Sequence, residues 1–89
     1  MKITIKMSKD IQALKQEYFK LMRQLDELRA ERRRLISQRR GYNIPNNEFH
    51  RRYQEIISQE TELTAKIRET ELKIKVAEIK ELLENNKFT

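Results

Sequence analysis

The chain has one glycine and one proline among its 89 residues, and both lie in a single heptapeptide, G-Y-N-I-P-N-N, at residues 41–47. A sheet needs turn residues at regular intervals, and Gly and Pro supply most of them. An all-β or α/β fold is therefore nearly excluded. We expect one all-α domain over residues 1–89, with an extended arm at 1–8, helices at 9–40 and 47–85, and a turn at 41–46.

The turn residues each have an expected role. Gly41 suits the C′ position that follows a helix, where the backbone is left-handed. Pro45 restricts Ile44 before it to an extended conformation. Asn46 or Asn47 can then cap the start of the second helix, because an asparagine side chain accepts hydrogen bonds from first-turn amides.

Both long segments carry seam residues at alternating steps of three and four, the pattern of a coiled coil. If the chain folds back at the turn, the two patterns match without adjustment, pairing position 35 with 53, 25 with 63 and 21 with 67. An antiparallel helical hairpin is therefore predicted. Its seam consists of Ile11, Leu14, Tyr18, Leu21, Leu25, Leu28, Arg32, Leu35 and Arg39, facing Phe49, Tyr53, Ile56, Glu60, Leu63, Ile67, Thr70, Ile74 and Ala77.

Residues 1–7 alternate between apolar and polar side chains, which is the period of a strand or an extended arm. Because the second helix is expected to be longer than the first, we expect this arm to cover the overhang. Residues 72–76 alternate in the same way, so a short pairing between the two chain ends is the competing interpretation.

A second apolar stripe lies on the second helix, opposite the seam. Leu72, Val76, Ile79 and Leu83 step by four, three and four residues. Leaving four such side chains in water is costly, since burying one stabilises a protein by roughly 1.5 to 3 kcal/mol. We expect two chains to associate through this face as a homodimeric four-helix bundle, although residues 1–7 covering part of the stripe is an alternative. Phe19 and Met22 also lie off the seam.

The formal net charge of +6 is confined to one part of the chain. Residues 29–52 contain eight arginines against two glutamates, whereas the basic and acidic residues elsewhere balance. Two of these arginines have a structural explanation at the seam. Arg32 is close to Glu60, and Arg39 faces the ring of Phe49.

The other arginines have too few acidic neighbours, so we expect an acidic partner at the turn end of the hairpin. Arginine binds phosphate in a bidentate manner and stacks on rings, which favours RNA or DNA as the partner. An acidic protein surface is the alternative, in which the protein is an adaptor or inhibitor. The candidate binding residues are Arg29, Arg33, Arg34, Arg40, Tyr42, Arg51 and Arg52.

Several other classes of function find no support in the composition. The chain has no Cys and a single His, so no disulfide or histidine metal centre is expected. No apolar run is long enough to span a membrane, and residues 1–9 lack the apolar region of a signal peptide, which predicts a soluble cytoplasmic protein. His50 has no catalytic partner at a recognisable spacing. We expect a non-catalytic, regulatory binding protein with no metal, cofactor or small-molecule substrate.

Two short segments resemble parts of known families. Residues 24–41, Q-L-D-E-L-R-A-E-R-R-R-L-I-S-Q-R-R-G, resemble the coiled-coil arm of seryl-tRNA synthetases, which implies contact with tRNA. Residues 42–89 do not resemble a synthetase body. Residues 58–62, S-Q-E-T-E, are similar to the SQELD peptide of small sporulation phosphatases that act on response regulators. Thr61 and Glu62 depart from that peptide.

The length, the expected dimer and the A-E-R-R text at 30–33 resemble the all-helical chorismate mutases. That resemblance implies an enzyme as a remote alternative. The chain departs from the family at Arg52, where a second active-site carboxylate is needed, and at residues 60–75, which show no break into a third helix. The resemblance would give substrate-binding roles to Arg32, Arg39, Glu48 and Arg51.

Overall fold

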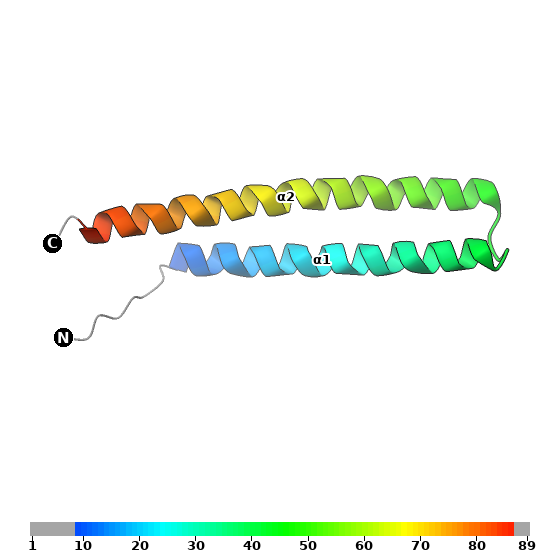
Figure 1. Ribbon diagram of the computed structural model, residues 1–89, viewed down its shortest axis with the longest axis horizontal. Helices are drawn as coiled ribbons and strands as arrows, with labels where there is room; N and C mark the ends of the chain where they lie inside the picture. The colour runs from blue at the N-terminus through cyan, green and yellow to red at the C-terminus, as the bar shows by residue number, and fades with distance from the viewer. Residues whose placement is uncertain (1–8, 87–89) are drawn as a thin grey trace.

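A computed structural model describes residues 9–86 and shows two long antiparallel helices, α1 (Lys9–Arg40) and α2 (Asn46–Asn86), lying side by side along their length (Figure 1). The molecule is a rod of 67 × 21 × 15 Å. Within the described residues there is no strand, which confirms the all-α hairpin. The helices were expected at 9–40 and 47–85, so the first range agrees with the structure and the second differs by one residue at each end.

Two expectations concerned the chain ends. Residues 72–76 lie inside α2, so their interpretation as a strand is wrong; the helical pattern on both sides continues through them. The arm predicted at 1–8 lies outside the described residues. At 41 residues against 32, α2 is longer than α1 by about 14 Å at 1.5 Å per residue, and it continues past the start of α1 (Figure 1).

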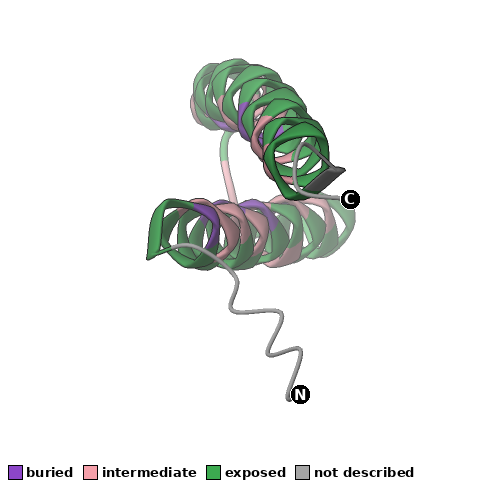
Figure 2. Ribbon diagram, turned by 90° about the vertical axis from the view of Figure 1, so that its left-hand side faces the viewer, coloured by how far each residue is buried: buried purple, intermediate pink, exposed green. Residues whose placement is uncertain are grey.

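The buried residues follow the predicted seam, because each helix has one apolar stripe and the hairpin lays the two stripes against each other (Figure 2). Thr70 is the one polar residue among them, and its hydroxyl donates to the Lys66 carbonyl oxygen at 2.8 Å. The buried apolar side chains are Ile11, Leu21, Leu25, Leu35, Phe49, Ile56 and Ile67.

The seam contains two hydrophobic clusters with a charged layer between them. The turn-end cluster brings together Leu35, Phe49, Ile56, Ile36, Ile44 and Tyr53. The second cluster brings together Leu21, Leu25, Ile67, Tyr18, Met22 and Leu63. The members of each predicted pair, 35 with 53, 25 with 63 and 21 with 67, lie in the same cluster. Met22 packs against this core, although its position is off the seam, whereas Phe19 is exposed.

The left-handed residue of the turn is Tyr42, with φ of 56°, and not Gly41 as expected. The Gly41 amide still donates to the Ser37 carbonyl oxygen in the helical pattern. The Tyr42 and Asn43 amides donate to the carbonyl oxygens of Arg39 and Gln38, which is the bond pair of a Schellman motif. The C′ position therefore falls one residue later than predicted, because α1 keeps its hydrogen bonds for one residue more.

The start of α2 also differs from the expectation. The first helical bond runs from the Phe49 amide to the Pro45 carbonyl oxygen at 2.9 Å, so the helix begins at Asn46, one residue early. Asn47 thus lies inside the first turn. Its side-chain oxygen accepts a bond from the Glu48 amide at 2.9 Å, which satisfies one of the free first-turn donors.

Replacing Tyr42 with glycine should stabilise the protein. A non-glycine residue in the left-handed region costs roughly 1 to 2 kcal/mol, and an exposed tyrosine loses no packing when removed. After allowing for the greater freedom of glycine in the unfolded chain, we expect a gain of about 1 kcal/mol, or about 4 to 8 °C in thermal midpoint. Tyr42→Ala keeps the strain and is the control. An unchanged midpoint in Tyr42→Gly would contradict the prediction.

Candidate nucleic-acid interface

Three of the eight turn-end arginines have partners within the hairpin. Arg32 lies 3.3 Å from Glu60 and Arg39 lies 4.6 Å over the Phe49 ring, so both seam predictions are confirmed. Arg52 also has a partner, Glu48 at 2.8 Å, one helical turn away. The expectation that Arg52 lacks an acidic neighbour is therefore wrong.

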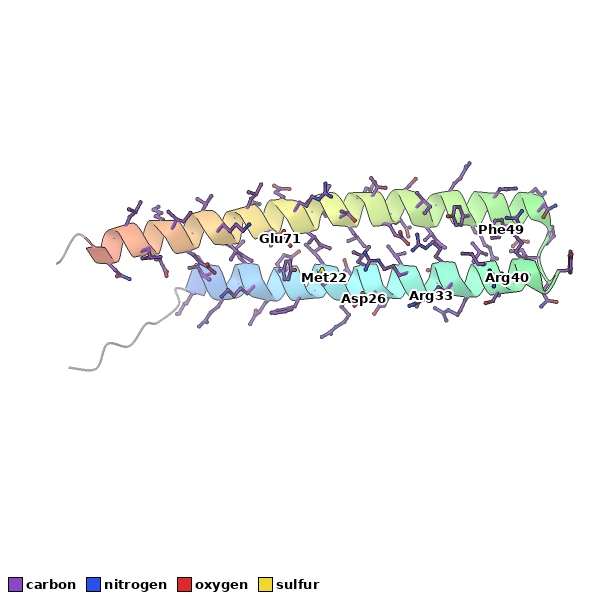
Figure 3. The ribbon with its side chains drawn as sticks, viewed as in Figure 1. Met22, Asp26, Arg33, Arg40, Phe49 and Glu71 are labelled. Carbon is purple, nitrogen blue, oxygen red and sulfur yellow. The ribbon has the colours of Figure 1, made fainter. Side chains whose placement is uncertain are left out.

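The remaining arginines divide between the two sides of the seam. On α1, Arg29, Arg33 and Arg40 follow the same line as Ile36, at steps of four, three and four residues, so they share one side of the helix. Ile36 and Arg40 line a groove of about 860 Å³ near the turn. Figure 3 shows Arg33 and Arg40 on the half of α1 nearer the turn, and Phe49 on α2 just after the turn. We call the surface of Arg29, Arg33, Arg40 and His50 the basic face.

The basic face has no carboxylate partners. Within residues 9–86, no acidic oxygen lies within 4.0 Å of its three guanidinium groups. The neighbouring groove on α2 contains Glu60, but that carboxylate pairs with Arg32. Asp26, three residues before Arg29, is the acidic residue at the end of the arginine row on α1. The positive charge on this side is therefore not neutralised within the described chain.

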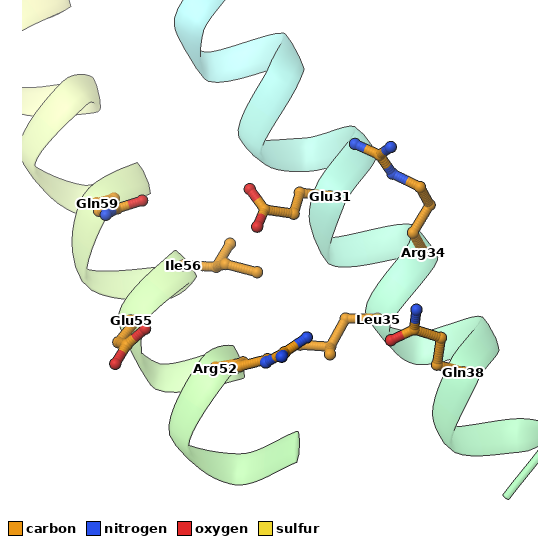
Figure 4. A pocket seen from close by; sticks show the side chains of 8 residues that line it. All are labelled: Glu31, Arg34, Leu35, Gln38, Arg52, Glu55, Ile56 and Gln59. Atoms are coloured by element: carbon orange, nitrogen blue, oxygen red, sulfur yellow. The ribbon is translucent and has the colours of Figure 1, made fainter. Parts of the chain in front are cut away.

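The opposite side of the seam has mixed charge. A groove of about 430 Å³ holds Arg34 and Arg52 together with Glu31 and Glu55. In Figure 4, Arg52 extends from α2 toward Leu35 on α1, while Glu31 projects from α1 toward α2. An adjoining groove contains Glu27, Glu62 and Lys66. This side offers a polyanion several carboxylates, which repel it.

The structure therefore divides the predicted set of site residues. Arg29, Arg33 and Arg40 lie on the basic face, and Tyr42 lies in the turn beside it. Arg34 and Arg52 lie on the mixed side. Arg51, two residues from Phe49 and two from Tyr53, points away from the seam. His50 belongs to the basic face, and sequence reasoning missed it. Its spacing of three residues from Tyr53 and four from Asn46, which also line the groove, could have indicated this position.

Aromatic side chains hold the groove near the turn in shape. The Phe49 ring stacks on Tyr53 at 5.6 Å with an interplanar angle of 23°, and it meets His50 edge-on at 5.6 Å. Arg39 covers the Phe49 ring. Tyr42, by contrast, is 94% exposed at the rim of this groove. The groove is therefore lined by rings that contact one another, with one exposed aromatic side chain at its rim.

Other kinds of site receive no support from the described residues. Among residues 9–86, no group of three His, Cys, Asp or Glu side chains is arranged to hold a metal ion, and neither helix has an apolar stretch that would cross a bilayer. Helix α2 runs unbroken through 60–75. The four residues that the chorismate mutase resemblance indicates lie in different places on the hairpin. Arg32 and Arg39 are at the seam, and Glu48 pairs with Arg52 on the mixed side. Arg51 points away from the seam.

Comparison of the chain with protein-family models, with curated proteins and with solved structures finds no match.

The second apolar stripe is exposed, as its position on α2 predicts. Its four side chains, Leu72, Val76, Ile79 and Leu83, are 58 to 63% exposed, and the adjacent Leu82 is equally open. We call Leu72, Val76, Ile79 and Leu83 the outer stripe. It lies at the open end of the hairpin, far along α2 from the basic face.

Proposed function

We propose that this protein is a small, non-catalytic nucleic-acid-binding protein and that its basic face is the binding surface. The observation that supports this proposal is the row of three exposed arginines, none of which has a carboxylate partner in the described chain. A guanidinium group donates two parallel hydrogen bonds to a phosphate, and its charge displaces the counterions bound there.

The length of the row suits a nucleic-acid backbone. From Arg29 to Arg40 is 11 residues, or about 17 Å along the helix. At about 3.4 Å per nucleotide of one strand, the row covers roughly five nucleotides. The mixed charge on the opposite side supports binding by one side only. An acidic protein surface can pair with the same arginines and is the second candidate.

A salt titration tests the proposal. Fluorescence anisotropy should show binding of single-stranded RNA and duplex DNA at about 50 mM salt. If three phosphates are neutralised, affinity should fall about 20-fold for a single strand and about 40-fold for a duplex between 50 and 200 mM. Absence of binding to either nucleic acid at 50 mM would refute the proposal and favour an acidic protein surface.

We further propose that a second copy of the chain covers the outer stripe, giving a four-helix dimer. The stripe steps by four, three and four residues, so its spacing is the same in both chain directions. A two-fold axis brings the same patch of both chains together, and such a spacing is self-complementary when two copies of α2 run antiparallel. Residue 72 then faces 83, and 76 faces 79.

The two-fold axis of such a dimer lies between residues 77 and 78 of each chain. The arrangement would put the two turns, and hence the two basic faces, at opposite ends of a longer rod.

Val76→Glu combined with Ile79→Glu should convert the dimer to a monomer, because four carboxylates would meet at its centre. Sedimentation velocity at micromolar concentration measures this. Ser58→Glu with Ala65→Glu is the matched control, since it adds the same charge at exposed positions on the same line of α2. The control should remain dimeric. An unmodified protein that sediments as a monomer at that concentration would contradict the dimer.

A further inference from the structure

Tyr42 occupies a position that neither packing nor backbone geometry favours. Its side chain is 94% exposed, so it contributes almost nothing to the core. Its φ of 56° belongs to the region where glycine is preferred, and the chain places its one glycine a residue earlier. Strained residues of this kind are concentrated at ligand-binding sites. The exposure and the strain together point to a role in binding.

The surroundings of Tyr42 suit a nucleobase. It borders the groove of about 860 Å³ together with Arg39, Arg40 and His50, a combination of rings and cationic donors. A nucleobase has flat apolar faces, which stack on aromatic and guanidinium planes, and an edge with hydrogen-bond acceptors. Phe49 and Tyr53, which stack on each other, also line this groove and add to its aromatic surface.

We propose that Tyr42 stacks on an unpaired base and that the basic face therefore recognises single-stranded nucleic acid. This inference rests on the proposed nucleic-acid binding. Arg40 is two residues from Tyr42 and begins the arginine row, so a strand whose base stacks on Tyr42 has its next phosphates over Arg40, Arg33 and Arg29. The bases inside a duplex are already stacked and do not offer a free face to Tyr42.

Tryptophan fluorescence provides a direct test, because the chain has no tryptophan. In Tyr42→Trp, the single indole should be quenched when a single-stranded heptanucleotide is added, since stacking brings it into contact with a base. Phe19→Trp is the control, being another exposed aromatic position, ten residues before the first arginine of the row. Its fluorescence should not change. Quenching equal in the two variants, or absent from Tyr42→Trp when anisotropy shows binding, would overturn the inference.

Affinity for an abasic strand separates the base from the backbone. Tyr42→Ala should weaken binding of the heptanucleotide about 5- to 150-fold, the range for losing one stacked base, and should leave binding of an abasic strand of equal length unchanged. Tyr42→Phe should retain the affinity. Tyr42→Gly should bind as weakly as Tyr42→Ala although it is the more stable protein, so lost binding cannot be attributed to unfolding.

The two proposals fail in different ways. Equal binding of the heptanucleotide by the unmodified protein and Tyr42→Ala, at an affinity that still falls with salt, overturns the stacking role and leaves the basic face intact. Preference for a duplex over the single strand overturns it as well. If neither the heptanucleotide nor the abasic strand binds at about 50 mM salt, the proposed function fails together with the inference.

Discussion

Changing Arg29, Arg33 and Arg40 together to glutamine is expected to reduce the affinity for single-stranded RNA on the order of 100-fold at 0.1 M salt. Each phosphate contact on a single strand contributes about 0.7 to the slope of log affinity against log salt, so losing three removes about two from that slope. The residual binding should therefore be nearly independent of salt. Anisotropy titrations at three or four salt concentrations measure both quantities.

The matched control changes three arginines elsewhere. Arg23, Arg34 and Arg51 are exposed and off the basic face, so their change to glutamine alters the net charge equally. If the net charge alone attracted the nucleic acid, the two triple variants would bind equally weakly. We expect the control to lose less than a tenth of the effect on affinity. Equal losses would remove the basic face as the binding site.

Arg32→Gln is expected to destabilise the hairpin by about 2 kcal/mol. The Glu60 side chain is only 14% exposed, and its Oε1 atom has no hydrogen-bond partner in the described chain, so the Arg32 guanidinium at 3.3 Å is the contact that stabilises this carboxylate. Removing one member of a fully buried pair costs about 3 to 5 kcal/mol, and the partial exposure of Arg32 reduces this. Urea unfolding at fixed protein concentration measures the change.

The reverse substitution should behave differently. Glu60→Leu leaves Arg32 able to reach water, so we expect little loss or a gain in stability. Arg32→Leu combined with Glu60→Leu should be more stable than the unmodified protein by about 1 to 4 kcal/mol, because it joins the two hydrophobic clusters. Lys73→Gln, in the exposed pair with Glu69, is the control and should change stability by less than about 1 kcal/mol. If Arg32→Gln were as stable as the unmodified protein, the prediction that the Arg32–Glu60 pair stabilises the hairpin would be contradicted.

Much of the fold was accessible from local and periodic features of the sequence. Because the helix-breaking residues Gly41 and Pro45 both lie within 41–47, the rest of the chain can form two uninterrupted helices. The period of the apolar residues identifies the buried side of each helix. The Arg52 ion pair was also accessible, since Glu48 lies four residues before it on the same helix. The position of Tyr42 was less accessible, because the left-handed residue is set by where the last bonds of α1 end, a shift of one residue that composition does not specify.

The sequence by itself determined that this protein is a helical hairpin with an arginine-rich turn and a second apolar stripe, because helix periodicity and turn chemistry depend on neighbouring residues. Only the tertiary structure decided which residues of α2 lie beside each row of arginines on α1. Two helices contribute to each side of the seam, and their antiparallel packing places His50 in the same groove as Arg40 while it places Arg52 and Glu55 in the same groove as Arg34. Charge that is continuous along the chain is thereby divided into one basic side and one mixed side.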